Sequence, residues 1–324
     1  MFSDDAFTER QKKSRTDENL MKTVAILLAA YNGEKWIREQ IDSVLNQKDV
    51  AVTVFVSLDL STDKTMDILN SYSNNKVILL SYAQRFGAAA PNFYHLIKSV
   101  DFSVFDYIAL SDQDDIWLAD KMNAAINKLE SEDAVAYSSN VTAFWANGRK
   151  RAVIKATPQR KYDYLFESPG PGCSFVMKKE FALEFQNYMK DKDLLIQKLD
   201  WHDWAIYAYA RSKNYKWIID SKSYMLYRQH SNNQLGANSG INQFVKRMND
   251  ILNGYGIHQT VNIIHFLNIE NENFVKNWLN QGRNGYLYLS KKSRLCRRRK
   301  KDQVLFWFSC VLMWLKNVPM ESEK

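Results

Sequence analysis

The feature that most constrains the fold is a regular alternation of apolar runs and helical stretches up to about residue 130. Residues 23–30 (TVAILLAA) are typical of a buried strand, and apolar residues at helical spacing follow them. The same pair then recurs along the chain. Strands are expected at 23–30, 52–58, 76–82 and 105–110, and helices at 36–45, 62–72, 92–100 and 119–130. This order predicts βαβ units and a mostly parallel sheet with helices on both faces.

Sheets of this kind bind ligands beyond the carboxyl ends of their strands. Polar, turn-forming and acidic residues gather directly after the four expected strands, in the segments AAYNG, LDLSTD, QRFGAAAPN and SDQDDIW. The sequence therefore predicts a binding site that these four segments build together.

The alternation weakens after residue 131. A strand is expected at 134–139, a glycine-proline turn entering a strand at 170–177, helices at 179–190 and 201–211, and strands near 215–220 and 224–228. A polar loop at 231–242 leads into a region that is helical from residue 243 onward. We therefore expect a polar leader at 1–21, an α/β domain at 22–240 and a helical C-terminal region at 241–324.

The charge of the chain is concentrated in one place. The sequence has 44 Lys plus Arg against 36 Asp plus Glu, which gives a net charge of +8. Residues 291–301 (KKSRLCRRRKK) hold eight basic residues and no acidic one, so the remainder is balanced at 36 against 36. A protein that binds nucleic acid over a uniformly basic surface is therefore not expected.

Cysteine usage and hydropathy indicate a reducing compartment and no membrane span. Cys173, Cys296 and Cys310 are scattered and lack the spacing of a disulfide framework or a zinc site. The first twenty residues are polar, so no secretory signal is expected there. The longest nearly uncharged apolar run, 304–315, is shorter than the roughly 20 residues that a spanning helix needs. These features predict a cytoplasmic protein.

The segment SDQDD carries the strongest chemical signal. Asp112, Asp114 and Asp115 lie within four residues directly after an expected buried strand. Carboxylates this close repel one another, and Mg²⁺ offsets such charge by binding one or two of them together with water and phosphate oxygens. An Asp-x-Asp at this strand end could therefore hold a metal on a diphosphate. The alternative is a solvated acidic turn in which Asp115 or Asp120 begins the next helix.

Two further clusters could take part in chemistry. Asp203 lies between bulky aromatic residues in WHDW at the start of a helix, where partial desolvation would raise its pKa and improve it as a general base. The alternative is that Asp203 begins the helix while the tryptophans pack. In YRQHSNN, Arg228 and His230 could neutralise phosphate, or His230 could complete a metal site; a structural role for either is the alternative.

Several other classes of enzyme are excluded. The sequence contains no G-x-x-x-x-G-K-[ST], G-x-G-x-x-G or G-x-S-x-G pattern, and its histidines and cysteines lack zinc spacing. A P-loop nucleotidase, a dinucleotide-binding enzyme and an α/β-hydrolase are therefore not indicated.

The chain resembles the family 2 glycosyltransferases of the GT-A fold, especially bacterial rhamnosyltransferases of surface-polysaccharide assembly. The resemblance spans about residues 22–235 and rests on seven motifs in order: AILLAAYNGEKWIREQIDSVLNQ, VSLDLSTDKT, RFGAAAPNF, ALSDQDDIW, PGCSFVM, WHDW and YRQHSNN. It implies a GT-A (Rossmann-like) sheet and an inverting transfer of sugar from a nucleoside-diphosphate donor, with Mg²⁺ or Mn²⁺ as cofactor.

The resemblance also implies roles for the donor-side residues. Ala29 and Tyr31 would line the base pocket, Asp59 would lie beside the base or ribose, and Asp112 would contact the ribose region. Asp114 would bind the metal on the diphosphate.

On the acceptor side, the resemblance makes Asp203 the base that deprotonates the acceptor hydroxyl. His230 would approach the metal or the diphosphate. The residues expected to shape the acceptor side are Gly172, Cys173, Ser174 and Trp201.

The chain departs from the family pattern at two places. Many members have two aspartates where this chain has Leu58 and Asp59, and a small residue where it has Leu60. Many also have arginine where Pro91 precedes Asn92. This departure leaves two alternatives, that a phosphate contact is absent or that Arg85 supplies it.

These implications lead to one expectation for function and one for the C-terminal tail. We expect a donor of the dTDP-L-rhamnose type and a glycan or lipid-linked acceptor; a UDP-hexose or UDP-N-acetylhexosamine donor, or a non-catalytic sugar-nucleotide- or polysaccharide-binding protein, are the alternatives. Basic residues beside an aromatic-rich helix predict peripheral contact with an anionic membrane through residues 291–315, at the inner face of the cell membrane. The alternative is a helix that docks on the domain. No nucleic acid is expected as a partner.

Overall fold

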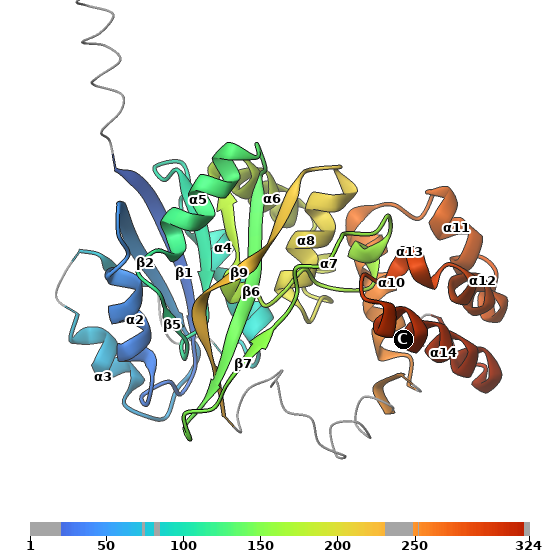
Figure 1. Cartoon of the computed structure of the whole chain (residues 1–324), viewed down its shortest axis with the longest axis horizontal. Helices are drawn as coiled ribbons and strands as arrows, with labels where there is room; N and C mark the ends of the chain where they lie inside the picture. The colour runs from blue at the N-terminus through green and yellow to red at the C-terminus, as the bar shows by residue number, and fades with distance from the viewer. Residues whose placement is uncertain (1–20, 73–74, 81–84, 231–248, 252, 321–324) are drawn as a thin grey trace, which may run out of the picture.

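A nine-stranded sheet runs through the computed structural model, which describes residues 21–72, 75–80, 85–230, 249–251 and 253–320 (Figure 1). The strand order is β3-β2-β1-β4-β8-β6-β9-β5, and β7 pairs with β6. The strands are β1 (Lys22–Ala30), β2 (Val50–Leu58), β3 (Val77–Leu79), β4 (Tyr107–Ser111), β5 (Ile116–Trp117), β6 (Ala136–Trp145), β7 (Lys150–Val153), β8 (Val176–Lys178) and β9 (Trp217–Gln229).

Helices cover both faces of this sheet, as the sequence predicts. Side chains of α2 (Ile37–Leu45), α3 (Thr65–Asn70) and α5 (Lys121–Ser131) join one hydrophobic cluster. Those of α4 (Ala89–Ser99), α6 (Lys179–Asp191) and α8 (His202–Ser212) join the other. Between α6 and α8 lies the short α7 (Asp193–Ile196), and two 3₁₀ turns, η1 (Asp163–Leu165) and η2 (Gly172–Ser174), precede β8.

The central strand β1 shows why the N-terminal half is parallel. Val24, Ile26 and Leu28 point into one hydrophobic cluster, and Ala25 and Leu27 point into the other, so both faces of the strand are buried. Strand β1 pairs in parallel with β2 and with β4. The carboxyl ends of these three strands therefore meet at one edge, and the polar segments that follow them lie together.

The second half of the sheet is mixed. Strand β8 runs antiparallel to both β4 and β6, and β5 runs antiparallel to β9. The two strands predicted near 215–220 and 224–228 are one strand, β9, which follows β6 in parallel through register shifts near Asn140. The polar residues SKSY in its middle resemble a turn, but pairing with β6 keeps the backbone extended. The two-residue β5 was not predicted, because the strand that it pairs with among the described residues is β9, more than a hundred residues away.

The C-terminal region is helical, as predicted. It comprises α10 (Tyr255–Leu267), α11 (Asn273–Leu279), η3 (Gly282–Asn284), α12 (Gly285–Lys291), α13 (Ser293–Cys296) and α14 (Lys300–Lys316), at the red end of Figure 1. These helices share a hydrophobic cluster with the sheet domain; the Phe166 ring, for example, contacts Trp278 and Phe306. The predicted leader, the predicted loop at 231–242 and the predicted domain boundary at 240 lie outside the described residues.

Candidate functional site

A cavity of about 520 Å³ opens where β1, β2 and β4 end. Its size lies within the range of small-molecule sites. Predicted residues from segments far apart in the sequence line it together: Ala29, Tyr31, Asp59, Asp112, Asp114, Gly172, Trp201, Asp203 and His230. Arg85 and Asn92 line it as well. The parallel strands thus bring the predicted segments to one place.

Gln113 joins the loops that follow β1 and β4. Its Oε1 accepts a hydrogen bond from Tyr31 N–H at 2.8 Å, and its Nε2 donates to the Tyr31 carbonyl at 2.7 Å. Asn32 adopts the left-handed conformation (φ 45°), and its amide donates to Ser61 Oγ, beyond β2. Three loops are therefore tied together around Tyr31, which exposes about half of its surface to the cavity side.

Asp59 lines the cavity but is also held by the backbone. Its Oδ1 accepts hydrogen bonds from the amides of Leu60 (2.7 Å) and Phe86 (3.0 Å), and its Oδ2 accepts one from Gly87 (2.7 Å). The side chain is only 5% exposed. It therefore fixes the loop that carries Arg85, in addition to whatever contact it makes with a ligand.

Asn92 directly follows Pro91, the position where the resemblance leads us to expect arginine. It is buried, and its Nδ2 donates to the carbonyls of Ala30 (3.4 Å) and Ser57 (3.1 Å). It joins the ends of β1 and β2 to α4. Arg85, which also lines the cavity, is the exposed cation of this loop.

Asp114 and His230 converge on the cavity wall. Asp114 Oδ2 lies 2.7 Å from His230 Nε2, and the imidazole stacks on Trp36 at a centroid distance of 4.1 Å. A carboxylate oxygen and an imidazole nitrogen are donors that suit Mn²⁺, and carboxylate oxygen suits Mg²⁺. The pair therefore fits a divalent cation, which would replace the hydrogen bond between the two side chains.

Arg228 holds the acidic loop in place instead of lying free to meet phosphate. Its backbone amide donates to Asp115 Oδ1 at 3.0 Å, and its Nε donates to the Asp114 carbonyl at 2.7 Å. Its guanidinium pairs with Glu39 and lies over the ring of Phe144. The sequence left a phosphate role open for Arg228; the structure shows a contact that ties β9 to the loop after β4.

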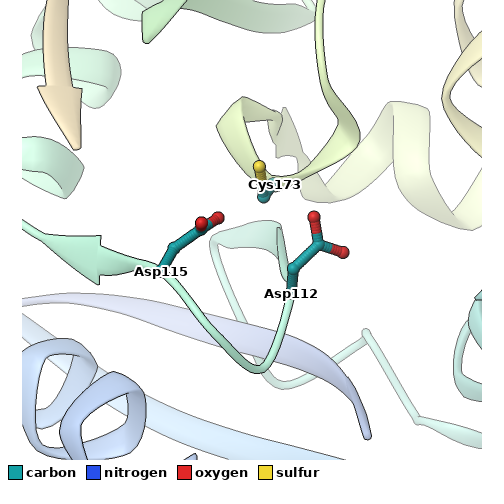
Figure 2. Close-up of side chains that lie close together, drawn as sticks. All are labelled: Asp112, Asp115 and Cys173. Carbon is teal, nitrogen blue, oxygen red and sulfur yellow. The ribbon is translucent and has the colours of Figure 1, made fainter. Parts of the chain in front are cut away.

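Behind this wall, Asp115, Asp112 and Cys173 form a cluster whose ligand atoms lie within 4.8 Å of one another (Figure 2). Asp115 and Cys173 are fully buried, whereas Asp112 reaches the cavity. Burial, followed by the charges of Asp115 and Asp112, raises the pKa of the Cys173 thiol well above its usual value. A thiol that keeps its proton is a poor ligand for Mg²⁺ or Mn²⁺, so this cluster suits a cation less well than the pair of Asp114 and His230.

This geometry corrects part of the predicted acceptor side. Gly172 lines the cavity, but Cys173 and Ser174 have no exposed surface and lie behind the wall. All three residues form the buried 3₁₀ turn η2, and only the glycine borders the cavity. Cys173 and Ser174 therefore support the wall and do not face a ligand.

Asp203 lies in the first turn of α8, after the N-cap residue Trp201. Its Oδ1 accepts a hydrogen bond from Trp204 N–H at 2.8 Å, and its Oδ2 lies 2.8 Å from Ser168 Oγ. Burial, the largest influence, raises the pKa of Asp203, while the bonds from Ser168 and Trp204 and the charge of Lys155 partly lower it. A cavity-facing carboxylate with a raised pKa has the character of a general base.

Two neighbours of Asp203 shape the same wall. The His202 ring is stacked on Phe93 with centroids 4.0 Å apart, and burial lowers its pKa to about 3, so that it stays neutral. Asp200, at the cavity rim, accepts a hydrogen bond at 2.8 Å from the hydroxyl of Tyr255 in the C-terminal region. Tyr255 in turn accepts one from Trp201 Nε1 at 3.0 Å.

Sequence reasoning missed several residues of the site. Gln113 was part of a recognised motif, but nothing in SDQDD reveals that its amide bridges the Tyr31 backbone. Trp36 appeared only as an apolar residue of a helix. Ser168 and Tyr255 lie in segments without any chemical pattern, and only the fold brings them to Asp203 and Asp200. For these two, no signal in a single sequence would have sufficed.

Comparisons with known proteins find several relatives of this chain. The family described as Glycosyl transferase family 2 matches residues 25–236. The dTDP-rhamnosyl transferase RfbG of Shigella flexneri is 43% identical over 288 residues, which cover 88% of this chain and 99% of that protein. The Escherichia coli glucosyltransferase WfaP, which is named as using UDP-Glc and α-D-GlcNAc-diphosphoundecaprenol, is 26% identical over 73% of this chain and 88% of its own length.

Two solved structures show the same fold. TarS 1–349 of S. aureus, in complex with UDP-GlcNAc, has a TM-score of 0.51 at 16% identity and covers 91% of this chain and 89% of its own. The mannosyltransferase PcManGT of Pyrobaculum calidifontis, in complex with GDP-Man and Mn²⁺, has a TM-score of 0.50 at 11% identity, covering 95% and 94%. The predicted fold class is confirmed. The family model matches most of the sheet domain, and the Shigella flexneri relative is 43% identical over 88% of this chain. This chain is therefore an enzyme of glycosyl transferase family 2.

Proposed function

We propose that this enzyme is an inverting rhamnosyltransferase. It transfers L-rhamnose from dTDP-L-rhamnose to a hydroxyl of a glycan or lipid-linked acceptor in the synthesis of a cell-surface polysaccharide. The observation that carries this proposal is the 43% identity to a dTDP-rhamnosyl transferase over 99% of that protein. The cavity supports it, because the candidate cation ligands and the candidate base line the same space.

The donor occupies the part of the cavity formed by the loops after β1, β2 and β4. Ala29 and Tyr31 line the base pocket, and Asp59 lies beside the base or ribose. Asp112 contacts the ribose region. The double hydrogen bond from Gln113 to Tyr31 keeps this pocket in shape.

Asp114 and His230 would hold a divalent cation on this side of the cavity. Such a cation, when bound, supplies Lewis-acid stabilisation of the negative charge that develops on the leaving group. Trp36 restricts the orientation of the His230 ring by stacking on it. Arg228 keeps the backbone of Asp114 at a fixed distance from β9.

Asp203 removes the proton from the acceptor hydroxyl as its oxygen attacks the anomeric carbon. A bond forms between the acceptor oxygen and this carbon, and the bond from the carbon to the diphosphate oxygen breaks, its electron pair leaving with dTDP. The reacting sugar passes through an oxocarbenium-like state, as in glycoside hydrolysis. Because attack comes from the face opposite the leaving group, a β-linked donor gives an α-linked product. Gly172 and Trp201 shape the space for the acceptor.

The decisive experiment is a panel of sugar nucleotides with the purified full-length enzyme, scoring cation-dependent binding and nucleotide release. We expect dTDP-L-rhamnose to be preferred; preference for UDP-glucose or UDP-N-acetylglucosamine would reassign the donor while keeping the fold and the base. Binding of a donor without release in the presence of any acceptor pool would favour a non-catalytic protein. The anomeric configuration of the product, read by NMR, tests inversion.

Two substitutions test the assigned roles. Asp203→Asn should keep donor binding and lower transfer by roughly 100-fold or more, the usual contribution of a general base. Asp114→Ala should abolish cation-dependent turnover, and EDTA should do the same to the unaltered enzyme. Full turnover in EDTA would exclude the cation, and unchanged turnover in Asp203→Asn would mean that another group is the base.

We also propose that α14 contacts an anionic membrane surface at the inner face of the cell membrane. The inner side of this helix docks on the protein through Gln303, Cys310 and Met313. Its outer side is apolar, with these residues exposed by 45 to 67%: Val304, Leu305, Trp307, Phe308 and Leu315. A helix with aromatic residues outward and basic residues at its end is typical of an element that lies in the membrane interface.

The exposed basic residues near α14 fit this surface. Arg294 in α13 is exposed, as are Lys300 and Lys301 at the start of α14. Each cation near an anionic leaflet is worth about 1 kcal/mol. No helix in the described ranges is long and apolar enough to span a bilayer. Contact through α14 would be peripheral, and it would keep the cavity near lipid-linked acceptors.

Vesicle flotation tests this surface on the full chain. The double substitution Trp307→Ser and Phe308→Ser should abolish flotation with vesicles that contain an anionic lipid, while neutral vesicles should bind weakly in either case. Leu194→Ser, which removes a 79% exposed leucine from α7, is the matched control and should change nothing. Equal flotation of the double variant and the control would show that α14 does not contact lipid.

A further inference from the structure

Ser168 lies between the candidate base and a backbone carbonyl. Its Oγ is 2.8 Å from Asp203 Oδ2 and 2.6 Å from the Gly170 carbonyl oxygen. Both neighbours accept hydrogen bonds when Asp203 is ionised, but a serine hydroxyl has one proton to donate. The hydroxyl can therefore satisfy only one of them at a time, and which one depends on whether Asp203 holds a proton.

We infer that Ser168 is a positioning residue whose hydroxyl donates to Asp203 when Asp203 is ionised and to the Gly170 carbonyl when Asp203 is protonated. Arg298 of the C-terminal region holds Ser168 in place. The inference rests on the proposed role of Asp203 as base. With Asp203 ionised, the Ser168 hydroxyl donates to Oδ2 and orients the carboxylate toward the acceptor. After Asp203 has taken the acceptor proton, the carboxylic O–H donates to Ser168 Oγ, and Ser168 donates to the Gly170 carbonyl. The Gly170 carbonyl therefore lacks this donor while Asp203 is ionised and gains it once Asp203 is protonated.

Arg298 fixes the backbone that carries this hydroxyl. Its Nη2 donates to the Ser168 carbonyl at 2.6 Å, and its backbone amide donates to Glu167 Oε1 at 2.7 Å. The side chain is only 4% exposed, and its Nε also lies 3.5 Å from Glu167 Oε1. The neighbouring Arg297 donates to the Phe166 carbonyl at 3.1 Å. The segment between α13 and α14 thus holds three successive residues of the loop that carries Ser168.

Other charged groups around Asp203 do not substitute for this contact. Lys155 stabilises the ionised carboxylate through its charge, and Asp112 and Tyr94 interact with it electrostatically from the loop after β4 and from α4. Within the described residues, no hydrogen bond is formed between these three side chains and the Asp203 oxygens. They influence the charge of Asp203, whereas Ser168 also sets its orientation.

The kinetic consequence has a definite direction. The hydrogen bond from Ser168 lowers the pKa of Asp203 against the effect of burial. Ser168→Ala should therefore raise this pKa, and the acidic limb of the profile of kcat/KM against pH should move to higher pH. Loss of one hydrogen bond to a charged group should also lower kcat by about tenfold. The KM for the donor should not change, because Ser168 is not among the residues that line the cavity.

The experiment compares full pH profiles of purified Ser168→Ala and Arg298→Lys with that of the unaltered enzyme. Arg298→Lys keeps the charge but cannot reproduce the paired contacts with Ser168 and Glu167. We expect both variants to move the acidic limb the same way, and the double variant to add little to either single one. Lys276→Ala, which removes an exposed cation from α11, is the control and should keep the original profile.

Each result has one meaning. If Ser168→Ala lowers kcat without moving the acidic limb, or if melting temperature falls in step with activity, Ser168 has only a structural role and the inference is wrong. If Arg298→Lys keeps the original profile while Ser168→Ala changes it, Arg298 does not hold the serine. Failure of the proposed base is distinguished by Asp203→Asn, whose turnover would then stay high whatever Ser168 does.

Discussion

Gly172 is the position where one added methyl group should disturb the active site most. A Cβ built on Gly172 would lie 2.4 Å from Nε2 of His202, whereas ordinary van der Waals contact begins near 3.4 Å. The imidazole or the η2 turn would have to move by about 1 Å. The Nε2 atom is buried and the ring is stacked on Phe93, and both features resist movement of the ring. Gly172→Ala should therefore push on the residue that directly precedes Asp203.

The magnitude follows from similar cases of overpacking. Forcing extra atoms into a packed site costs about 1–3 kcal/mol of unfolding free energy, which corresponds to a melting temperature lower by roughly 2–5 °C in a chain of this length. The effect on transfer should be larger, because a misplacement of about 1 Å at a reacting group can lower the rate on the order of 100-fold. Donor affinity should change little, since the loops after β1 and β2 are not involved.

Three measurements decide this prediction: thermal unfolding, donor binding by calorimetry, and initial rates of nucleotide release. Gly256→Ala is the matched control, because a Cβ there meets no atom within 4 Å. The double variant of Gly172→Ala with His202→Ala removes the clash and should recover most of the lost stability. If Gly172→Ala melts and turns over like the unaltered enzyme, or if the double variant recovers nothing, the clash with His202 is not the cause and the reasoning fails.

Three other predictions concern the donor loops, a buried ion pair and the base. Gln113→Ala should raise the donor KM by about tenfold through loss of two hydrogen bonds to Tyr31, with Gln113→Glu intermediate in steady-state kinetics because it keeps only one. Arg211→Ala should lower the free energy of unfolding in urea by about 3 kcal/mol, since it leaves the fully buried carboxylate of Asp163 without its closest cation; a loss below 1 kcal/mol would show that Tyr207 and the backbone suffice. Burial raises the pKa of Asp203, and the base acts ionised, so kcat/KM should fall on acidification at a higher pH than for an ordinary aspartate, and Asp203→Asn should lack this limb.

The sequence was most informative where local pattern and fold agree. Strands buried on both faces read as continuous apolar runs, so the strands of the parallel half and the segments after them could be predicted. The topology then brings those segments together without further information. This is why most of the predicted site residues line one cavity, although they lie as far apart as Ala29 and His230.

The remainder depended on contacts that no local pattern encodes. Strand β5 exists because residues 116 and 117 meet β9, and nothing in IW alone favours a strand over a loop. Whether Cys173 faces the ligand or the sheet depends on one 3₁₀ turn, and turn geometry in a run of glycine and proline is poorly determined by residue type. Ser168 became part of the site only through the conformation of a loop between η1 and η2.

The basic run at 291–301 shows most clearly that the fold can give different roles to neighbouring residues of the same type. As sequence, its eight cations form one patch, and a membrane is a sufficient explanation for all of them. In the structure the patch is divided, because Glu167 and the buried Asp163 lie against one side of the segment and draw Arg298 inward, whereas Arg294, Lys300 and Lys301 stay exposed. No rule of local sequence could assign these sides, since the acidic partners lie about 130 residues earlier. The same short segment therefore contacts the loop that carries Ser168 on one side and leads into the exposed face of α14 on the other. A truncation that removed both would conflate the two roles, and single substitutions on each side are needed to separate catalysis from membrane contact.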